Sequence, residues 1–262
     1  MSKPTRVSLA GFPDVVIHAL ESEVKRHADY SAAKAGDIVA AGNLVADTIA
    51  DEAVERICVM TNGLDVEILP IHALESAGVN EIPAALAKCL SARLGVPINE
   101  SIVQINTVGH TGASGYHRMA NQALFDGEVK PNRFYLAVDD FIGQGGTLAN
   151  LIGFIGSRGG KVFGATVLTG KPYSAKIAPE LSSIELLRRQ HGTELENWWR
   201  ETFGFGFDFL TRSEARYLEN SPDADTIRNR LIAARPESGA ELSGKTLDPI
   251  NGLGATTAQS KH

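Results

Sequence analysis

Cysteine is scarce in this sequence. Only Cys58 and Cys89 occur among 262 residues, both in apolar stretches, and no Cys-x-x-Cys pair is present. A disulfide framework or a thiolate metal site needs several cysteines at short intervals, so both are excluded. We expect two reduced, buried thiols, as is usual in a reducing compartment.

A long apolar run and an excess of basic residues are also missing. No apolar stretch approaches the ~20 residues that span a bilayer, and residues 1–13 lack the apolar segment of a secretory signal. Lys and Arg number 25 against 31 Asp and Glu, which gives a net charge of −6. A protein surface that binds nucleic acid in general carries more Lys and Arg than Asp and Glu. The sequence therefore predicts a cytoplasmic protein with no membrane and no nucleic-acid partner.

The apolar residues change their period several times along the chain. Helical spacing over residues 14–55 gives way to strand and helix signals that alternate up to residue 172, and helical spacing returns from residue 179. Alternation of this kind predicts an α/β fold with a parallel sheet and helices on both faces. Expected strands cover residues 57–60, 66–71, 102–105, 134–138 and 162–168. The expected divisions are an N-terminal helical segment 1–56, an α/β core 57–172, a C-terminal helical segment 173–235 and a flexible tail 236–262.

The most informative segment is the strand, turn and helix start between Tyr135 and Thr147. A buried strand ends in Asp139 and Asp140, and three glycines follow before the helix. Backbone N–H groups freed by glycines, together with a helix N-terminus, hold phosphate. Carboxylates beside them accept hydrogen bonds from sugar hydroxyls or hold a hydrated Mg²⁺. Because ligands bind at the carboxyl edge of open α/β sheets, this segment predicts a sugar-phosphate site. The competing interpretation is a plain strand-to-helix turn with a capping acid.

This segment resembles the phosphoribosyl pyrophosphate (PRPP) loop of the type I phosphoribosyltransferases. It keeps the apolar strand, the acidic pair, Ile142, Gly145 and Thr147, and departs from the family pattern at Phe141, Gly143 and Gln144. The resemblance implies an open, mostly parallel sheet of about five strands. It also implies that Asp139 and Asp140 bind the ribose. The 5′-phosphate would be held by the loop residues Gly143, Gln144, Gly145, Gly146 and Thr147.

Further segments resemble the family in their order along the chain, over residues 57–172. A pyrophosphate loop without Arg or Lys corresponds to Ala73, Leu74, Glu75, Ser76, Ala77 and Gly78. Residues 106–122 correspond to the flexible loop that closes the family's active site. Arg118 and Asn121 within it, followed by Phe125, look like the competence-protein F-like branch. The resemblance implies that Tyr116 and Arg118 meet the leaving group, whereas both could equally be solvated loop residues.

The resemblance implies a Mg²⁺-dependent phosphoribosyltransferase that transfers the phosphoribosyl group of PRPP to an unidentified base or amine and releases pyrophosphate. Lys171 falls where the family places residues facing the acceptor, although it could be a surface lysine. Similarity to the family also suggests a homodimer. Two alternatives stay open: a protein that binds PRPP or nucleotides in the same pocket without turnover, and a hydrolase in which water attacks the sugar.

Overall fold

The computed structural model describes residues 3–72, 74–75, 78–109 and 113–235. Its centre is a sheet of four parallel strands in the order β1-β8-β7-β2. These strands are β1 (Val16–Ala19), β2 (Val66–Pro70), β7 (Phe134–Ile142) and β8 (Lys161–Gly170). The α/β class and the parallel sheet predicted from the sequence are confirmed.

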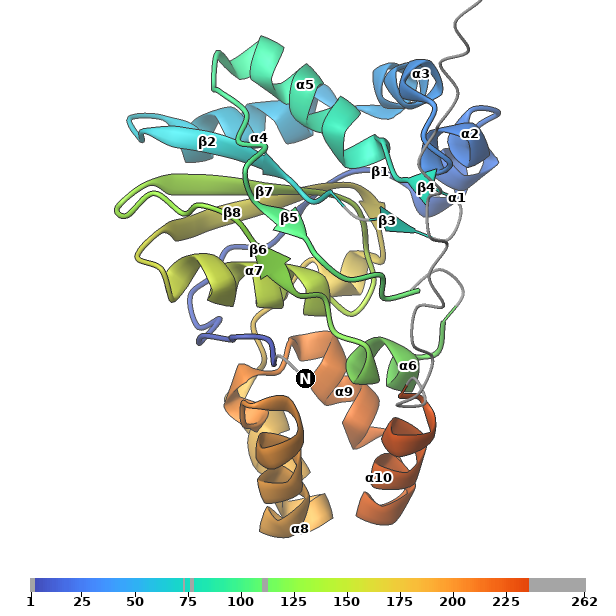
Figure 1. Ribbon diagram of the computed structural model, residues 1–262, viewed down its shortest axis with the longest axis vertical. Helices are drawn as coiled ribbons and strands as arrows, with labels where there is room; N and C mark the ends of the chain where they lie inside the picture. The colour runs from blue at the N-terminus through green and yellow to red at the C-terminus, as the bar shows by residue number, and fades with distance from the viewer. Residues whose placement is uncertain (1–2, 73, 76–77, 110–112, 236–262) are drawn as a thin grey trace, which may run out of the picture.

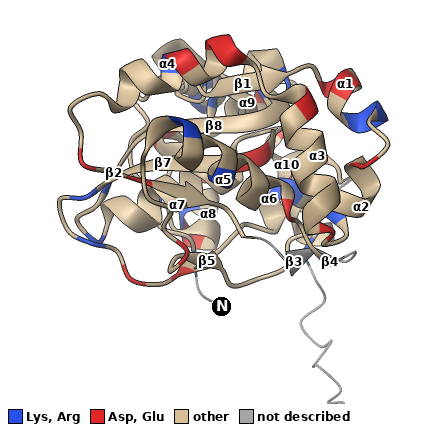
Figure 2. Cartoon of the chain, turned by 90° about the horizontal axis from the view of Figure 1, so that it is seen from above, with Lys and Arg blue, Asp and Glu red and all other residues tan. Residues whose placement is uncertain are grey.

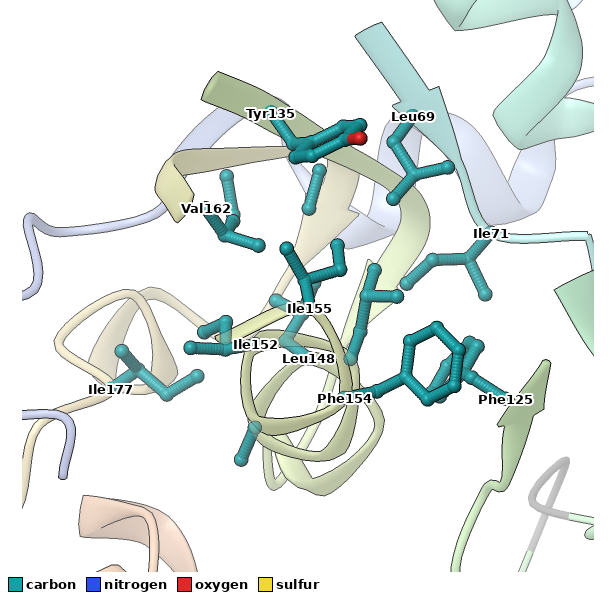
Figure 3. Packing of buried hydrophobic residues seen from close by; sticks show 14 of the residues in the cluster. Leu69, Ile71, Phe125, Tyr135, Leu148, Ile152, Phe154, Ile155, Val162 and Ile177 are labelled. Carbon is teal, nitrogen blue, oxygen red and sulfur yellow. The ribbon is translucent and has the colours of Figure 1, made fainter. Parts of the chain in front are cut away.

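Helices cover both faces of this sheet (Figure 1). One face carries α3 (Ile38–Thr48), α4 (Asp51–Thr61) and α5 (Ile82–Leu94), and the other carries α7 (Gly146–Gly156). Alternate residues of β7 divide between the two cores, because successive side chains of a strand point to opposite faces. Leu136 and Val138 pack with the α3–α5 side. Tyr135 and Ala137 pack with α7, in the cluster that Figure 3 shows.

The start of the chain differs from its predicted helical character. Residues 16–19 form the edge strand β1, which pairs with β8, and α1 (Glu21–Arg26), α2 (Tyr30–Lys34) and α3 follow. The predicted strand at 57–60 is also wrong, since these residues end helix α4. Short apolar runs fit either period, so length and packing decide between them. Within α4, Ile57 is buried whereas Cys58 is exposed, so the expectation of a buried thiol is wrong for Cys58.

The strand predicted at 102–105 does not join the main sheet. Its residues supply β5 (Val103–Gln104), which pairs antiparallel with β6 (Phe125–Asp126) in a separate two-stranded sheet. A second small hairpin pairs β3 (Leu74–Glu75) with β4 (Gly78–Val79). The main sheet in the described part of the chain therefore has four strands and not about five.

The C-terminal helices form a separate hydrophobic cluster below the sheet (Figure 1). It contains α8 (Leu181–Phe203), the 3₁₀ helix Phe207–Phe209, α9 (Arg212–Glu219) and α10 (Ala224–Ala233). Trp199 is fully buried at its centre. A capping box begins α9, with Thr211 and Glu214 each accepting from the other's backbone N–H. The predicted tail 236–262 lies outside the described residues.

No helix in the described ranges combines the length and the apolar character needed to cross a bilayer.

Candidate functional site

A cavity lies where β7 ends and α7 begins. Asp139 and Asp140 occupy the last part of β7 itself, and the glycine turn then leads into the helix. Gly145 sits at the N-cap of α7 with φ of 78°, a left-handed conformation that glycine adopts without steric cost. The acidic pair and all five predicted phosphate-binding residues, 143–147, line this one cavity. The structure therefore brings these predicted residues together.

The two carboxyl groups have different surroundings. Asp140 accepts an ion-paired hydrogen bond from Lys34 of α2, with Nζ and Oδ2 3.0 Å apart. Asp139 accepts the backbone N–H of Asp140 at 2.8 Å. Burial, and then the neighbouring Asp140 carboxylate, raise the pKa of Asp139 well above its usual range, while Lys34 partly opposes the shift. The raised pKa favours the protonated form of Asp139, in which its carboxyl group can donate a hydrogen bond.

Arg118 lies against the glycine turn. A methyl group at Gly143 would come within 2.5 Å of its Nη1, so the guanidinium lies directly on the backbone of the turn. Arg118 Nε donates to the Ala113 carbonyl at 3.3 Å, and no carboxylate partner for the guanidinium exists among the described residues. Its half-burial lowers its pKa through desolvation. A guanidinium without a counter-charge beside free backbone N–H groups suits a phosphate. Arg118 therefore lies beside the predicted 5′-phosphate loop.

A buried ion pair supports the back of the same turn. Arg6 Nη1 and Nη2 contact Glu214 Oε2 and Oε1 at 2.5 and 2.8 Å, and Arg6 Nε donates to Asn150 of α7 at 2.7 Å. The two ion-paired side chains are 0% and 3% exposed. A methyl group at Gly146 would lie 2.7 Å from Glu214 Oε1. Thr211 Oγ1 donates to the Gln144 carbonyl at 2.5 Å. Arg6 near the N-terminus and the Thr211–Glu214 segment of the C-terminal helices thus pack together against the glycine turn.

Three cavity-lining cations were missed at the level of sequence. Arg6, Lys25 and Lys34 come from the N-terminal segment, from α1 and from α2. Lys25 pairs with Glu21 at 2.5 Å and lies 5.0 Å from the centre of the Phe141 ring. Acidic and basic residues stand close together on α1 (Figure 2). No motif or spacing marks these lysines, because each reaches the cavity only through the packing of its helix.

Tyr116 does not reach the cavity, which corrects its predicted contact with a leaving group. Its side chain is 5% exposed within the C-terminal cluster. The hydroxyl lies 2.6 Å from Ser221 Oγ, and the ring meets the edge of Tyr217 at 5.0 Å between centres. The predicted flexible loop contains α6 (Gly115–Ala120) here. Asn121, just after it, donates to the Ala234 carbonyl at 2.8 Å, so α6 is tied to the C-terminal helices.

The predicted pyrophosphate loop lies between β2 and α5, as expected from its order. Its described backbone forms the β3–β4 hairpin, and Ala73, Ser76 and Ala77 lie outside the described residues. Gly78 has φ of 134°, and a methyl group there would come within 2.6 Å of the Ala35 carbonyl. Ile71 and Asn80, at the two ends of the loop, line the cavity. The loop thus borders the site and packs against the end of α2.

Lys171 does not line this cavity. It forms an ion pair with Glu21 at 2.5 Å and lines a second cavity, which also includes Gly143 and Gln144 of the glycine turn. The structure therefore separates the predicted acceptor residue from the acidic pair but keeps it next to the same loop.

Comparisons with known proteins give relatives but no family. No family model matches the chain. Protein TraN of Escherichia coli is 39% identical over 237 residues, which cover 90% of this chain and 53% of TraN. An uncharacterized protein of Haemophilus influenzae is 38% identical over 144 residues, which cover 55% of this chain and 32% of that protein. The chain thus spans about half of TraN and about a third of the other relative.

Among solved structures, this chain is similar to UMP synthase of Leishmania donovani. The matched part covers 75% of this chain and 48% of the UMP synthase chain. The TM-score is 0.29 and the sequence identity is 14%.

Proposed function

We propose that this protein binds PRPP and transfers its phosphoribosyl group to a nitrogen acceptor. One observation carries the proposal: the acidic pair Asp139–Asp140 and the glycine turn that opens α7 line one cavity. Arg118, a cation without a carboxylate partner in the described ranges, lies against that turn. Carboxyl groups suit the ribose hydroxyls, and the turn with Arg118 suits the 5′-phosphate.

In this reaction the acceptor nitrogen attacks C1 of the ribose. The bond from C1 to the diphosphate oxygen breaks, and pyrophosphate leaves with the electron pair through an oxocarbenium-like state. The protein contributes positioning and charge stabilisation. A protonated Asp139 would donate to one ribose hydroxyl, and Asp140, held by Lys34, would accept from the other.

Mg²⁺ would reach the site together with the diphosphate. Within the described residues, no group of three or more His, Cys, Asp and Glu side chains could hold a metal ion. Mg²⁺ in nucleotide sites is commonly bound by one or two carboxylates plus phosphate oxygens, and Asp140 would supply one such carboxylate. When bound, the ion would neutralise charge on the leaving pyrophosphate.

Binding without turnover is the second candidate. Residues 73–78, which correspond to the pyrophosphate loop, contain no Lys or Arg. A site that holds the ribose phosphate firmly but the diphosphate weakly would favour a sensing role. Release of pyrophosphate in the presence of a panel of bases and amines separates a transferase from a sensor, and release of ribose 5-phosphate without acceptor would indicate the hydrolase.

The test is calorimetric titration of PRPP with Mg²⁺ into the full chain. We expect Asp139→Asn/Asp140→Asn to weaken binding at least about 100-fold, because two groups that contact the ribose are altered. Glu52→Gln/Glu55→Gln is the matched control, since it neutralises two carboxylates on the outer surface of α4. Equal binding by the native chain and the Asp139/Asp140 variant, or no binding by the native chain, would overturn the proposal.

A further inference from the structure

A second cavity adjoins the main one along Gly143 and Gln144 of the glycine turn and is not lined by the acidic pair. We propose that it binds the acceptor, and that the acceptor is a planar aromatic acid, a ring that carries a carboxylate. This inference rests on the proposed function, because it assigns the second substrate of the same reaction.

The two cavities share one wall. Both are lined by Lys25, Arg118, Phe141, Gly143 and Gln144. Phe141 of this wall directly follows the acidic pair in β7, so a molecule in the second cavity would lie next to the ribose end of the main cavity as well as to the glycine turn. This adjacency is what transfer between two bound substrates requires.

The charge of the second cavity selects an anion. Its lining has four cations, Lys25, Arg118, Lys171 and Arg216, and one carboxylate, Glu21. Glu21 forms ion pairs with two lysines, with Oε1 2.5 Å from Lys25 Nζ and Oε2 2.5 Å from Lys171 Nζ. Among the described residues neither arginine has a carboxylate partner. The chain as a whole has a net charge of −6, so this concentration of cations runs against its average.

Aromatic rings in the same lining select a planar molecule. Phe141, Tyr173 and Tyr217 all contribute to the cavity. The Arg216 guanidinium lies 5.7 Å from the centre of the Tyr173 ring, and 58% of Tyr173 is exposed. A guanidinium beside a ring keeps its planar N–H groups free to bind a carboxylate in a bidentate manner. An aromatic acid can use the ring faces and the guanidinium together, whereas an uncharged base uses only the rings.

Gln144 provides polar groups at the boundary between the cavities. Both its amide nitrogen and its amide oxygen are buried, and neither has a hydrogen-bond partner among the described residues. A methyl group at Gly115 would lie 2.8 Å from the amide nitrogen, so the start of α6 covers this side chain. An unpartnered buried amide costs free energy. A ring nitrogen or carbonyl of the acceptor would provide a partner after a small shift of Gln144.

The experiment compares each aromatic acid with its uncharged counterpart. Nicotinate and nicotinamide form one pair, and orotate and uracil form another. Each is titrated calorimetrically into the full chain, with and without ribose 5-phosphate. We expect the acid of at least one pair to bind at least about tenfold more tightly than its neutral counterpart, since a charge-assisted bidentate pair supports this difference.

Arg216→Gln tests the position of the acid. Arg216 is exposed on α9 and lines the second cavity but not the main one. We therefore expect at least fivefold weaker acid binding, partial recovery in Arg216→Lys and unchanged binding of ribose 5-phosphate. Arg189→Gln, an exposed arginine of α8, is the matched control. Equal affinity for acid and neutral compound in both pairs would overturn the inference. So would acid binding that is unaffected by Arg216→Gln, or an Arg216-dependent preference for inorganic phosphate over both acids.

The two proposals can fail separately. If PRPP does not bind but an acid binds in an Arg216-dependent manner, the proposed function is wrong and the anion pocket stands. If PRPP binds and neither acid is preferred, the proposed function stands and the acceptor assignment is wrong.

Discussion

The two walls of the main cavity are built in different ways. The acidic and glycine wall is one continuous segment, residues 139–147, at the end of a strand and the start of a helix. The cationic wall collects Arg6, Lys25, Lys34 and Arg118 from four separate parts of the chain. A wall made by one local turn can be recognised in a sequence, whereas a wall made by packed helices exists only in the folded protein.

Two arginines at this cavity show a second contrast. Arg6 is buried and paired with Glu214, whereas Arg118 is half-buried without a carboxylate partner in the described part of the chain. The first arrangement stabilises the fold behind the glycine turn. The unpaired charge of Arg118 destabilises the fold, and a bound anion would compensate that charge. Breaking the Arg6–Glu214 pair should therefore lower the free energy of unfolding, whereas neutralising Arg118 should weaken anion binding without lowering it.

Glu214→Gln should have the largest effect. Removing one partner of a buried ion pair leaves Arg6 as an uncompensated charge, which costs about 3–5 kcal/mol. Denaturant unfolding measures the loss, and Glu201→Gln, an exposed acid at the end of α8, is the control. A loss below about 1 kcal/mol would show that water or another group compensates Arg6, and the contrast with Arg118 would disappear.

Arg118→Gln should separate binding from stability. We expect affinity for ribose 5-phosphate to fall about 10- to 100-fold, since a charge-assisted contact contributes about 1.5–3 kcal/mol. The free energy of unfolding should stay the same or rise, because the variant removes a desolvated charge whose pKa is lowered. Arg56→Gln on the surface of α4 is the matched control. Loss of stability with unchanged affinity would identify Arg118 as a structural residue.

Asp139→Asn should stabilise the protein by a smaller, pH-dependent amount. Since folding raises the pKa of Asp139, ionisation penalises the folded state above the ordinary aspartate range, and the penalty vanishes below about pH 4. Below about pH 4 the variant and the native protein should have the same melting temperature. At pH 7 the melting temperature of the variant should be higher, by about 2–4 °C for each 1 kcal/mol of added stability. Thermal melts at the two pH values measure this. A gain that is equal at both would mean that ionisation of Asp139 is not its cause.

Local sequence patterns predicted much of the fold. The segment from β7 through α7 to β8 was expected from its apolar runs and glycines. The errors fall where short apolar runs fit both periods, at β1 and at the end of α4. Packing resolved these cases, because β1 pairs with β8 at the edge of the sheet, whereas Ile57 of α4 is buried against the sheet.

The candidate site was predicted in part for the same reason. The positions of Asp139, Asp140 and residues 143–147 follow from one strand-to-helix turn. Tyr116 was misplaced because its loop folds into α6, whose apolar side chains pack against the C-terminal helices. Arg118 lies close by on the same helix yet reaches the cavity, because neighbouring residues of a helix point in different directions.

The sequence by itself determined the parallel α/β sheet and the turn that offers carboxylates and free N–H groups, because these depend on residues adjacent in the chain. Only the tertiary structure decided where the cations lie, which arginine is neutralised, and that Lys171 lines a second cavity with Arg216. Electrostatic effects act through space over a few ångströms, so groups more than 100 residues apart, such as Lys34 and Asp140, set each other's state once folding brings them together.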